Sequence, residues 1–173
     1  NWKAPSVVPL AQLFPLLEEL SMDVVERVPI ELLTPWPNLL RELQFSSKAT
    51  LPMECLESLP ETLEVLDVSA SLTVHEHHTV KWPSLTILRL TLRCSSLEIF
   101  RTLPSTLRKL YLDLDPMSSS STIPFDFWAI IPISLTKIDI FCMSHYAVLL
   151  ERPTPDQIRR LTSLRSLCFS ETV

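Results

Sequence analysis

Seven short segments of this chain share one apolar pattern, which constrains the fold more than any other feature of its 173 residues. In each segment an apolar residue stands at relative positions 1, 4 and 6. The anchors are Leu17-Leu20-Met22, Leu40-Leu43-Phe45, Leu63-Leu66-Val68, Leu85-Leu88-Leu90, Leu107-Leu110-Leu112, Leu135-Ile138-Ile140 and Leu164-Leu167-Phe169. Successive first anchors lie 23, 23, 22, 22, 28 and 29 residues apart. A pattern that recurs seven times in one register indicates an internal repeat of one supersecondary unit.

The alternation within each segment indicates a β-strand with two different faces. Residues at positions 4 and 6 point to one side and those at 3, 5 and 7 to the other, because strand side chains alternate. One such strand cannot bury its apolar face alone, so we expect a stacked parallel sheet with the connecting segments behind it. We expect a single domain over residues 1–173, with strands near 18–22, 41–45, 64–68, 86–90, 108–112, 136–140 and 165–169.

Proline marks the entry to nearly every predicted strand. The chain has 15 prolines and no glycine. An apolar-proline pair precedes six of the seven strands: Phe14-Pro15, Trp36-Pro37, Leu59-Pro60, Trp82-Pro83, Leu103-Pro104 and Ile131-Pro132. Proline ends a preceding helix and holds the residue before it extended, so the chain turns into the strand. We expect the apolar partner to be buried beneath the turn; for Trp36 and Trp82 the alternative is ligand binding.

The segments between the strands differ in kind. Thr154-Pro155-Asp156-Gln157 has the form of a capping box and predicts a helix to about Leu161, while Ser95-Ser96-Leu97-Glu98 predicts a shorter one through Arg101. One to two helical turns are expected at residues 53–58 and 125–131, and an extended or irregular stretch over 69–81.

The repeated pattern resembles that of leucine-rich-repeat proteins over about residues 14–170. Its Pro-x-[Ser/Thr]-Leu-x-x-Leu form is similar to intracellular fungal and protist repeats. The resemblance implies an α/β solenoid, a horseshoe arc with about seven parallel strands on its concave face and mixed short helices and irregular segments on its convex face. The family's asparagine or cysteine at position 9 is replaced here by Val25, Lys48, Ser71, Arg93, Asp115, Met143 and Thr172. Ser71, Asp115 and Thr172 are the candidates to replace the missing side-chain ladder in part.

The composition excludes several kinds of catalytic and binding motif. A chain without glycine has no P-loop, dinucleotide-binding turn, nucleophile elbow or EF-hand loop, since each needs a position without a Cβ atom. Cys55, Cys94, Cys142 and Cys168 are far apart, unlike zinc ligands. His75-Glu76-His77-His78 is expected to be a solvated loop, with a metal site as the alternative, and Ser118–Ser121 a polar insertion. We expect a protein that is not an enzyme and needs no cofactor or metal.

Charge and hydropathy bear on partners and location. The net charge of −5 argues against a nucleic-acid partner, whose phosphates require a basic face. The chain has no apolar run near the roughly 20 residues that span a bilayer. The widely spaced cysteines and the absence of an N-glycosylation acceptor favour an intracellular, cytoplasmic location. Because the chain starts at Asn1 and not at methionine, we expect a fragment or a processed product.

The expected concave face carries the candidate binding residues. These are Arg89, Lys109, Tyr111, Asp113, Lys137, Asp139 and Phe141, at positions 3, 5 and 7 of the middle and later strands. Arginine and tyrosine are typical interface anchors, and a flanking aromatic adds apolar area. The alternative is an ordinary solvated sheet in which Asp113 and Asp139 pair with the lysines across adjacent strands.

Three functions are compatible with this pattern. The first is a non-enzymatic module or scaffold that binds a protein partner on its concave face; the fold-level step is an analogy. The second is a structural subunit or arm of a large assembly, and the third is the substrate-recognition part of an F-box-type ubiquitin ligase. At the ends, a capping segment for the first strand is expected from Val7, Val8, Leu10, Leu13 and Phe14, and further chain or another subunit is expected to cover the edge at Leu164, Leu167 and Phe169.

Overall fold

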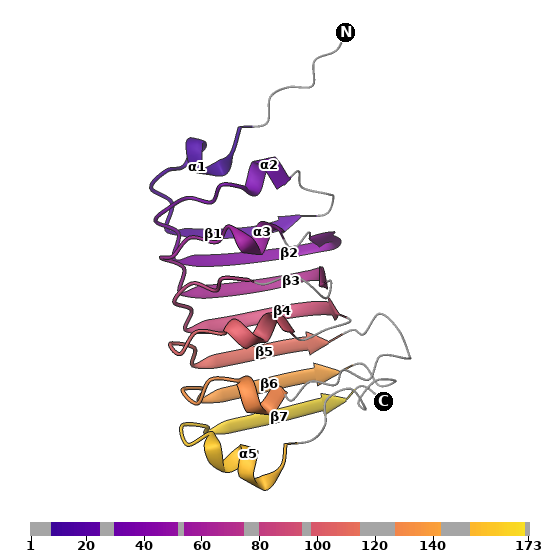
Figure 1. The fold of residues 1–173 in the computed structure, drawn as a ribbon. Coiled ribbons are helices and arrows are strands. Elements are labelled where there is room, and N and C mark those ends of the chain that lie inside the picture. Colours follow the sequence, from indigo (N-terminus) through magenta and orange to yellow (C-terminus); the bar gives the residue numbers. More distant parts are fainter. Residues whose placement is uncertain are drawn as a thin grey trace.

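The computed structural model describes residues 8–24, 30–51, 54–74, 80–94, 98–114, 127–142 and 153–171. Seven strands form one all-parallel sheet in the order β1-β2-β3-β4-β5-β6-β7, with short helices on one face of it, so the fold is α/β (Figure 1). The strands are β1 (Glu19–Val24), β2 (Glu42–Leu51), β3 (Val65–Val74), β4 (Ile87–Cys94), β5 (Lys109–Leu114), β6 (Lys137–Cys142) and β7 (Ser166–Glu171). The helices are α1 (Leu10–Leu13), α2 (Ile30–Leu33), α3 (Glu54–Glu57), the 3₁₀ helix η1 (Glu98–Thr102), α4 (Phe127–Ile130) and α5 (Pro155–Arg160).

The register of the sheet follows the sequence pattern. Each strand begins one residue after its expected start, at position 3 of its segment. The residues at that position are partners from strand to strand: Glu19, Glu42, Val65, Ile87, Lys109, Lys137 and Ser166. The pairing shifts after Ser46 and after Val68, where β2 and β3 continue into longer strands. Equal positions of the seven segments therefore form rows across the sheet.

The apolar anchors form the core between the sheet and the helices. The fourth-position anchors Leu43, Leu66, Leu88, Leu110 and Ile138 are at most 1% exposed. They belong to one cluster with residues of the connecting segments, such as Leu56 of α3 and Phe100 of η1. The prediction that positions 1, 4 and 6 face the core is confirmed for β2 to β6.

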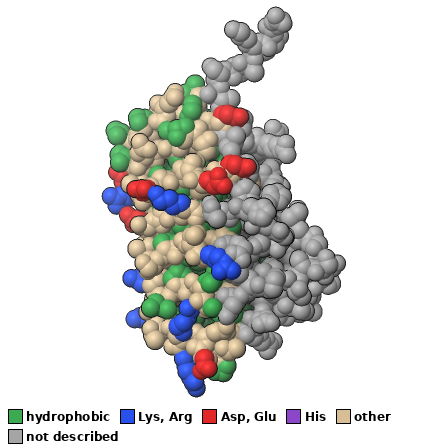
Figure 2. All heavy atoms as spheres, viewed as in Figure 1, with side chains coloured by type: hydrophobic (Ala, Val, Ile, Leu, Met, Phe, Trp, Pro, Cys, Tyr) green, Lys and Arg blue, Asp and Glu red, His purple; other side chains and the backbone are tan. Residues whose placement is uncertain are grey.

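Both ends of the sheet are less covered than its middle. In β7 Phe169 is 45% exposed, although it occupies the same position as the buried Ile140. At the other end the expected N-terminal cap is realised by Leu10 alone among the described residues, because Val8, Leu13 and Phe14 are exposed. Figure 2 shows apolar side chains gathered on the surface at the α1 end. The apolar core thus reaches the surface at both edges.

The connecting segments agree in part with the sequence analysis. Thr154 and Gln157 form the expected capping box of α5: Thr154 Oγ1 accepts from the Gln157 N–H at 3.3 Å, and Gln157 Oε1 accepts from the Thr154 N–H at 2.7 Å. Helices α3 and α4 lie within the expected stretches. The short helix that was expected to run through Arg101 is the 3₁₀ helix η1 in its described part. Its expected cap at Ser95 lies outside the described residues. Sequence analysis did not anticipate α2.

The two tryptophans that precede a proline, Trp36 and Trp82, are core residues. Trp36 and Trp82 are 3% and 7% exposed. Their indole Nε1–H groups donate to the carbonyls of Cys55 in α3 and Ile99 in η1, at 2.9 and 2.8 Å. This satisfies the polar atom of each buried ring. The core interpretation of both tryptophans is confirmed, whereas the same expectation is wrong for Phe14, which lies at the uncovered edge.

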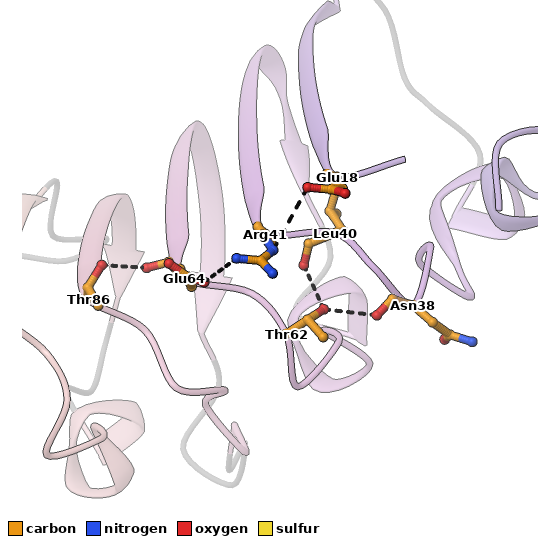
Figure 3. Close-up of polar contacts among 7 residues, drawn as sticks. All are labelled: Glu18, Asn38, Leu40, Arg41, Thr62, Glu64 and Thr86. Carbon is orange, nitrogen blue, oxygen red and sulfur yellow. Dashed lines mark hydrogen bonds and ion pairs between the residues drawn. The ribbon is translucent and has the colours of Figure 1, made fainter. Parts of the chain in front are cut away.

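A ladder of hydroxyl groups joins turns that lead into neighbouring strands, and Figure 3 shows its member Thr62. Thr62 Oγ1 donates to the carbonyls of Leu40 and Asn38, at 2.8 and 2.9 Å. Thr106 and Ser134 stand at the same position of their segments, and each donates at 2.8 Å to the first anchor of the preceding segment. At these three positions a serine or threonine before the first anchor therefore links neighbouring segments. The side chains expected to replace the family's asparagines, those of Ser71, Asp115 and Thr172, lie outside the described residues.

Candidate functional site

The face of the sheet opposite the helices, here called the open face, carries positions 3, 5 and 7 of every strand. All seven candidate residues lie on it, in strands β4, β5 and β6. Arg89, Tyr111 and Asp139 are direct partners in one row, which continues to Asp67 of β3 and Cys168 of β7. The strand register thus places a cation, an aromatic ring and two carboxylates side by side.

Two cations flank the ring of Tyr111. The Arg89 Cζ atom lies 4.7 Å from the ring centroid and the Lys137 Nζ atom 5.1 Å from it. Each cation is also held by a carboxylate: Arg89 Nη1 lies 2.8 Å from Asp67 Oδ2, and Lys137 Nζ lies 3.0 Å from Asp139 Oδ2. These contacts fix the positions of two long side chains that would otherwise be free to move in solvent.

The ion pair of Asp139 differs from the expected cross-strand pattern. Asp139 pairs with Lys137 of its own strand, two residues before it, while Arg89 of β4 pairs with Asp67 of the adjacent strand β3. Lys137 Nζ turns toward the Tyr111 ring, which brings it to the side of Asp139. The hydrogen bond to Asp139 is the main cause that raises the pKa of Lys137 above its usual 10.5.

A hollow of about 360 Å³ opens on this face across β3 to β7. Five of the seven candidates line it: Arg89, Tyr111, Asp113, Asp139 and Phe141. Lys137 contacts two of these residues without lining the hollow, and Lys109 lies outside it, exposed to solvent. The other polar residues that line the hollow are Ser69, Thr91, Cys168 and Ser170. Their positions in the repeat, 5 or 7, predict that they lie on the open face, but their small polar side chains gave no reason to select them as binding residues.

Asp139 is the least satisfied group of the hollow. Its Oδ1 atom is buried and accepts no hydrogen bond in the described part of the chain, while Oδ2 is engaged by Lys137. A buried acceptor without a donor carries a desolvation cost.

Among the cysteines whose side chains the structure describes, Cys55 is buried and Cys168 is exposed. Burial raises the pKa of the Cys55 thiol to about 11, so the thiol stays protonated near neutral pH. Cys168 is an exposed free thiol, 3.6 Å from the hydroxyl of Ser170. No group of three histidine, cysteine, aspartate or glutamate residues in the described ranges is arranged to hold a metal ion. The segment His75–His78, singled out as an alternative metal site, lies outside those ranges.

No family model, curated protein or solved structure matches this chain. None of the helices in the described ranges has the length and apolar character needed to cross a membrane. The case for a function consequently depends on the open face itself.

Proposed function

We propose that the chain is a leucine-rich-repeat solenoid whose open face is the concave face of an arc. Support comes from the spacing of the seven segments, whose first anchors lie 22 to 29 residues apart, and from their strands, which pair in chain order in the described sheet. A repeat of 20–29 residues with an L-x-x-L-x-L strand is the signature of this architecture. Stacked repeats bury a continuous core, and the anchors at 0–3% exposure in β2 to β6 form such a core.

The function that we propose for this solenoid is non-enzymatic binding of a protein partner on the open face. The observation that carries it is the row of Arg89, Tyr111 and Lys137 beside the hollow. Arginine and tyrosine are enriched among the residues that contribute most to binding at protein interfaces. Asp67 and Asp139 already restrain the two cations, so binding loses less side-chain entropy. The unpaired thiols of Cys55 and Cys168 fit the reducing interior of a cell, where we place the protein.

A triple substitution tests this proposal. The partner is captured from an extract and identified by mass spectrometry, and its purified form is then bound to wild type and to the Arg89→Glu, Lys109→Glu, Tyr111→Ala variant. We expect the affinity to fall at least a hundredfold, since central interface anchors contribute about 2 kcal/mol or more each. Unchanged affinity would refute binding on this part of the open face.

A matched control addresses the other end of the same face. Glu19→Lys, Ser21→Ala and Asp23→Lys change charge and size at positions 3, 5 and 7 of β1, where the side chains of all three residues are exposed. We expect this variant to keep the affinity within a few-fold of wild type. The two variants change the net charge in opposite directions, so a general electrostatic effect would change the affinity in opposite directions, and an equal loss in both would argue against a local site.

A second proposal, a structural subunit of a larger assembly, is favoured by the two uncovered edges. Leu13, Phe14 and Leu16 near α1 are 53%, 53% and 78% exposed. Edge strands of a parallel sheet with apolar neighbours are prone to pair with another chain. Size-exclusion chromatography at high concentration tests this proposal, and a stable, monodisperse monomer would argue against it.

A further inference from the structure

Each strand of the sheet joins the next through the same three backbone groups at its start. The carbonyl at position 2 of one segment accepts hydrogen bonds from the N–H groups at positions 2 and 3 of the following segment. Arg41 and Glu42, for example, donate to the Glu18 carbonyl at 2.7 and 3.1 Å. The arrangement recurs at every junction of the described sheet, from β1-β2 to β6-β7. The backbone geometry of a junction therefore does not depend on which two segments form it.

The two edge strands carry complementary halves of one such junction. In the described ranges no strand precedes β1 and none follows β7. By the same arrangement, the N–H groups of Glu18 and Glu19 point out of the sheet at the β1 edge, and the carbonyl of Arg165 points out of it at the β7 edge. An open edge of this kind is a template for pairing with another chain. Here the donors of one edge match the acceptor of the other.

The side chains at position 2 also interact from strand to strand (Figure 3). Arg41 lies between two carboxylates, with its Nε atom 3.9 Å from Glu18 Oε2 and its Nη1 atom 3.3 Å from Glu64 Oε1. This row of three exposed side chains keeps one negative charge in excess. Arg165 holds position 2 in the last segment, is exposed, and has no side-chain ion pair in the described ranges. If β1 of a second copy followed β7, Glu18 would stand beside Arg165 and the alternation of charge would continue.

The apolar surface at the two edges is the surface that a further segment would cover. In β7 the anchors Leu164 and Leu167 are only partly buried and Phe169 is 45% exposed, whereas the equivalent anchors of β2 to β6 are 0–3% exposed. Near the other edge Phe14 and Leu16 are 53% and 78% exposed. Repeats of this kind are stabilised by burying such apolar surface against a neighbouring repeat.

We propose that the chain associates with itself head to tail, with β7 of one copy paired in parallel with β1 of the next. This inference rests on the proposal of a structural subunit and names what covers its edges. A second copy brings the backbone donors, the carboxylate and the apolar anchors to the β7 edge in one register. The two contact surfaces differ, so each contact leaves an open edge at either end, and the assembly grows into a filament or closes into a ring.

An exchange of charge across the junction tests this contact. Sedimentation velocity measures the average mass of purified wild type, Glu18→Arg and Arg165→Glu at increasing concentration. We expect the mass of wild type to rise with concentration, and each variant to associate about tenfold more weakly, because like charges then face each other. An equimolar mixture of the two variants should regain most of the association, since every junction between unlike chains again sets an arginine beside a glutamate. A monomeric wild type, or a mixture that associates no better than its components, would overturn the proposal.

Two further variants separate the junction from a general effect of charge. Lys81→Glu changes the net charge as much as Arg165→Glu does, but at an exposed lysine in the turn before β4, away from both edges. It should associate like wild type, and a loss equal to that of Arg165→Glu would contradict the proposed contact. Glu19→Pro removes an N–H group that β1 presents at its open edge, where proline is tolerated. It should weaken association while the unfolding midpoint stays close to that of wild type.

This inference and the structural-subunit proposal fail in different ways. If wild type associates but the Glu18, Arg165 and Glu19 variants associate equally well, the head-to-tail contact falls and the subunit proposal stands. If wild type is monomeric at every concentration, both fall. Partner binding on the open face is tested separately, by the Arg89, Lys109 and Tyr111 variant.

Discussion

Replacement of Leu88 by alanine tests the assignment of the two faces of the sheet. Leu88 lies in β4, is 0% exposed, and has Leu66 and Leu110, also 0% exposed, as its partners in the adjacent strands. The truncation removes three carbon atoms, which cost about 2.4 kcal/mol at about 0.8 kcal/mol each. Because the flanking strands hold the neighbours in place, a cavity remains and raises the expected loss to roughly 3–4 kcal/mol.

Arg89→Ala is the control, because it removes a long side chain one residue further along the same strand but on the open face. Its ion pair with Asp67 is an exposed one and contributes about 0.2–1 kcal/mol. Its contact with the Tyr111 ring adds about 0.5–1 kcal/mol. We therefore expect a loss of about 1 kcal/mol, above the roughly 0.5 kcal/mol typical of a surface substitution without such contacts.

Urea unfolding followed by circular dichroism measures both losses. With an m-value of about 3 kcal/mol per molar, the Leu88→Ala midpoint falls by about 1 M and the Arg89→Ala midpoint by about 0.3 M. Comparable shifts would mean that Leu88 and Arg89 do not differ in burial, which would refute the register and the faces built on it. The m-values of the two variants should agree with that of wild type, so that the shifts report stability.

The hydroxyl ladder and the two described free cysteines lead to further expectations. Thr62→Val removes a hydroxyl that donates to two carbonyls and should cost about 1–2 kcal/mol in unfolding experiments. Ser84→Ala, at the equivalent position but without a hydrogen bond in the described ranges, should change stability little, and equal losses would argue against the ladder. Iodoacetamide should label the exposed Cys168 and spare the buried Cys55 in the folded protein, as located by peptide mass spectrometry; equal labelling would contradict this burial. Because burial raises the pKa of Cys55 from 9.0 to about 11, stability should fall as the pH rises through this range, more steeply in wild type than in Cys55→Ala; identical pH profiles would show that the thiol is not buried.

The sheet could be predicted from the sequence because its determinants are local. A strand of alternating polarity has only two ways to face the core, and seven segments with apolar residues at positions 1, 4 and 6 choose the same one. The row from Arg89 through Tyr111 to Asp139 follows directly from equal positions in adjacent segments. The capping box of α5 was equally accessible, since four consecutive residues specify it.

Other features depend on side-chain conformations that a one-dimensional pattern does not contain. The hollow includes Tyr111 but not Lys109, although both face the same side of β5. Asp139 pairs with Lys137 of its own strand because that lysine turns toward the ring of Tyr111, a choice among rotamers that strand position does not specify. Phe14 is exposed and precedes β1, which stands at the edge of the sheet in the described ranges; a pattern shared by all segments does not reveal which of them stands at an edge.

The hydroxyl-linked turns lie at the edge where the strands begin, and their length hardly varies. From the proline to the first anchor the distance is two or three residues, as in Pro60 to Leu63 and Pro83 to Leu85, while the complete segments range from 22 to 29 residues. In the sequence, differences in segment length therefore fall between the end of one strand and the next proline turn. The entry to each strand keeps its length from unit to unit, whereas the stretch that follows the strand varies. Units exchanged, duplicated or removed by recombination at the proline turns would keep the sheet in register and carry their own variable stretch with them.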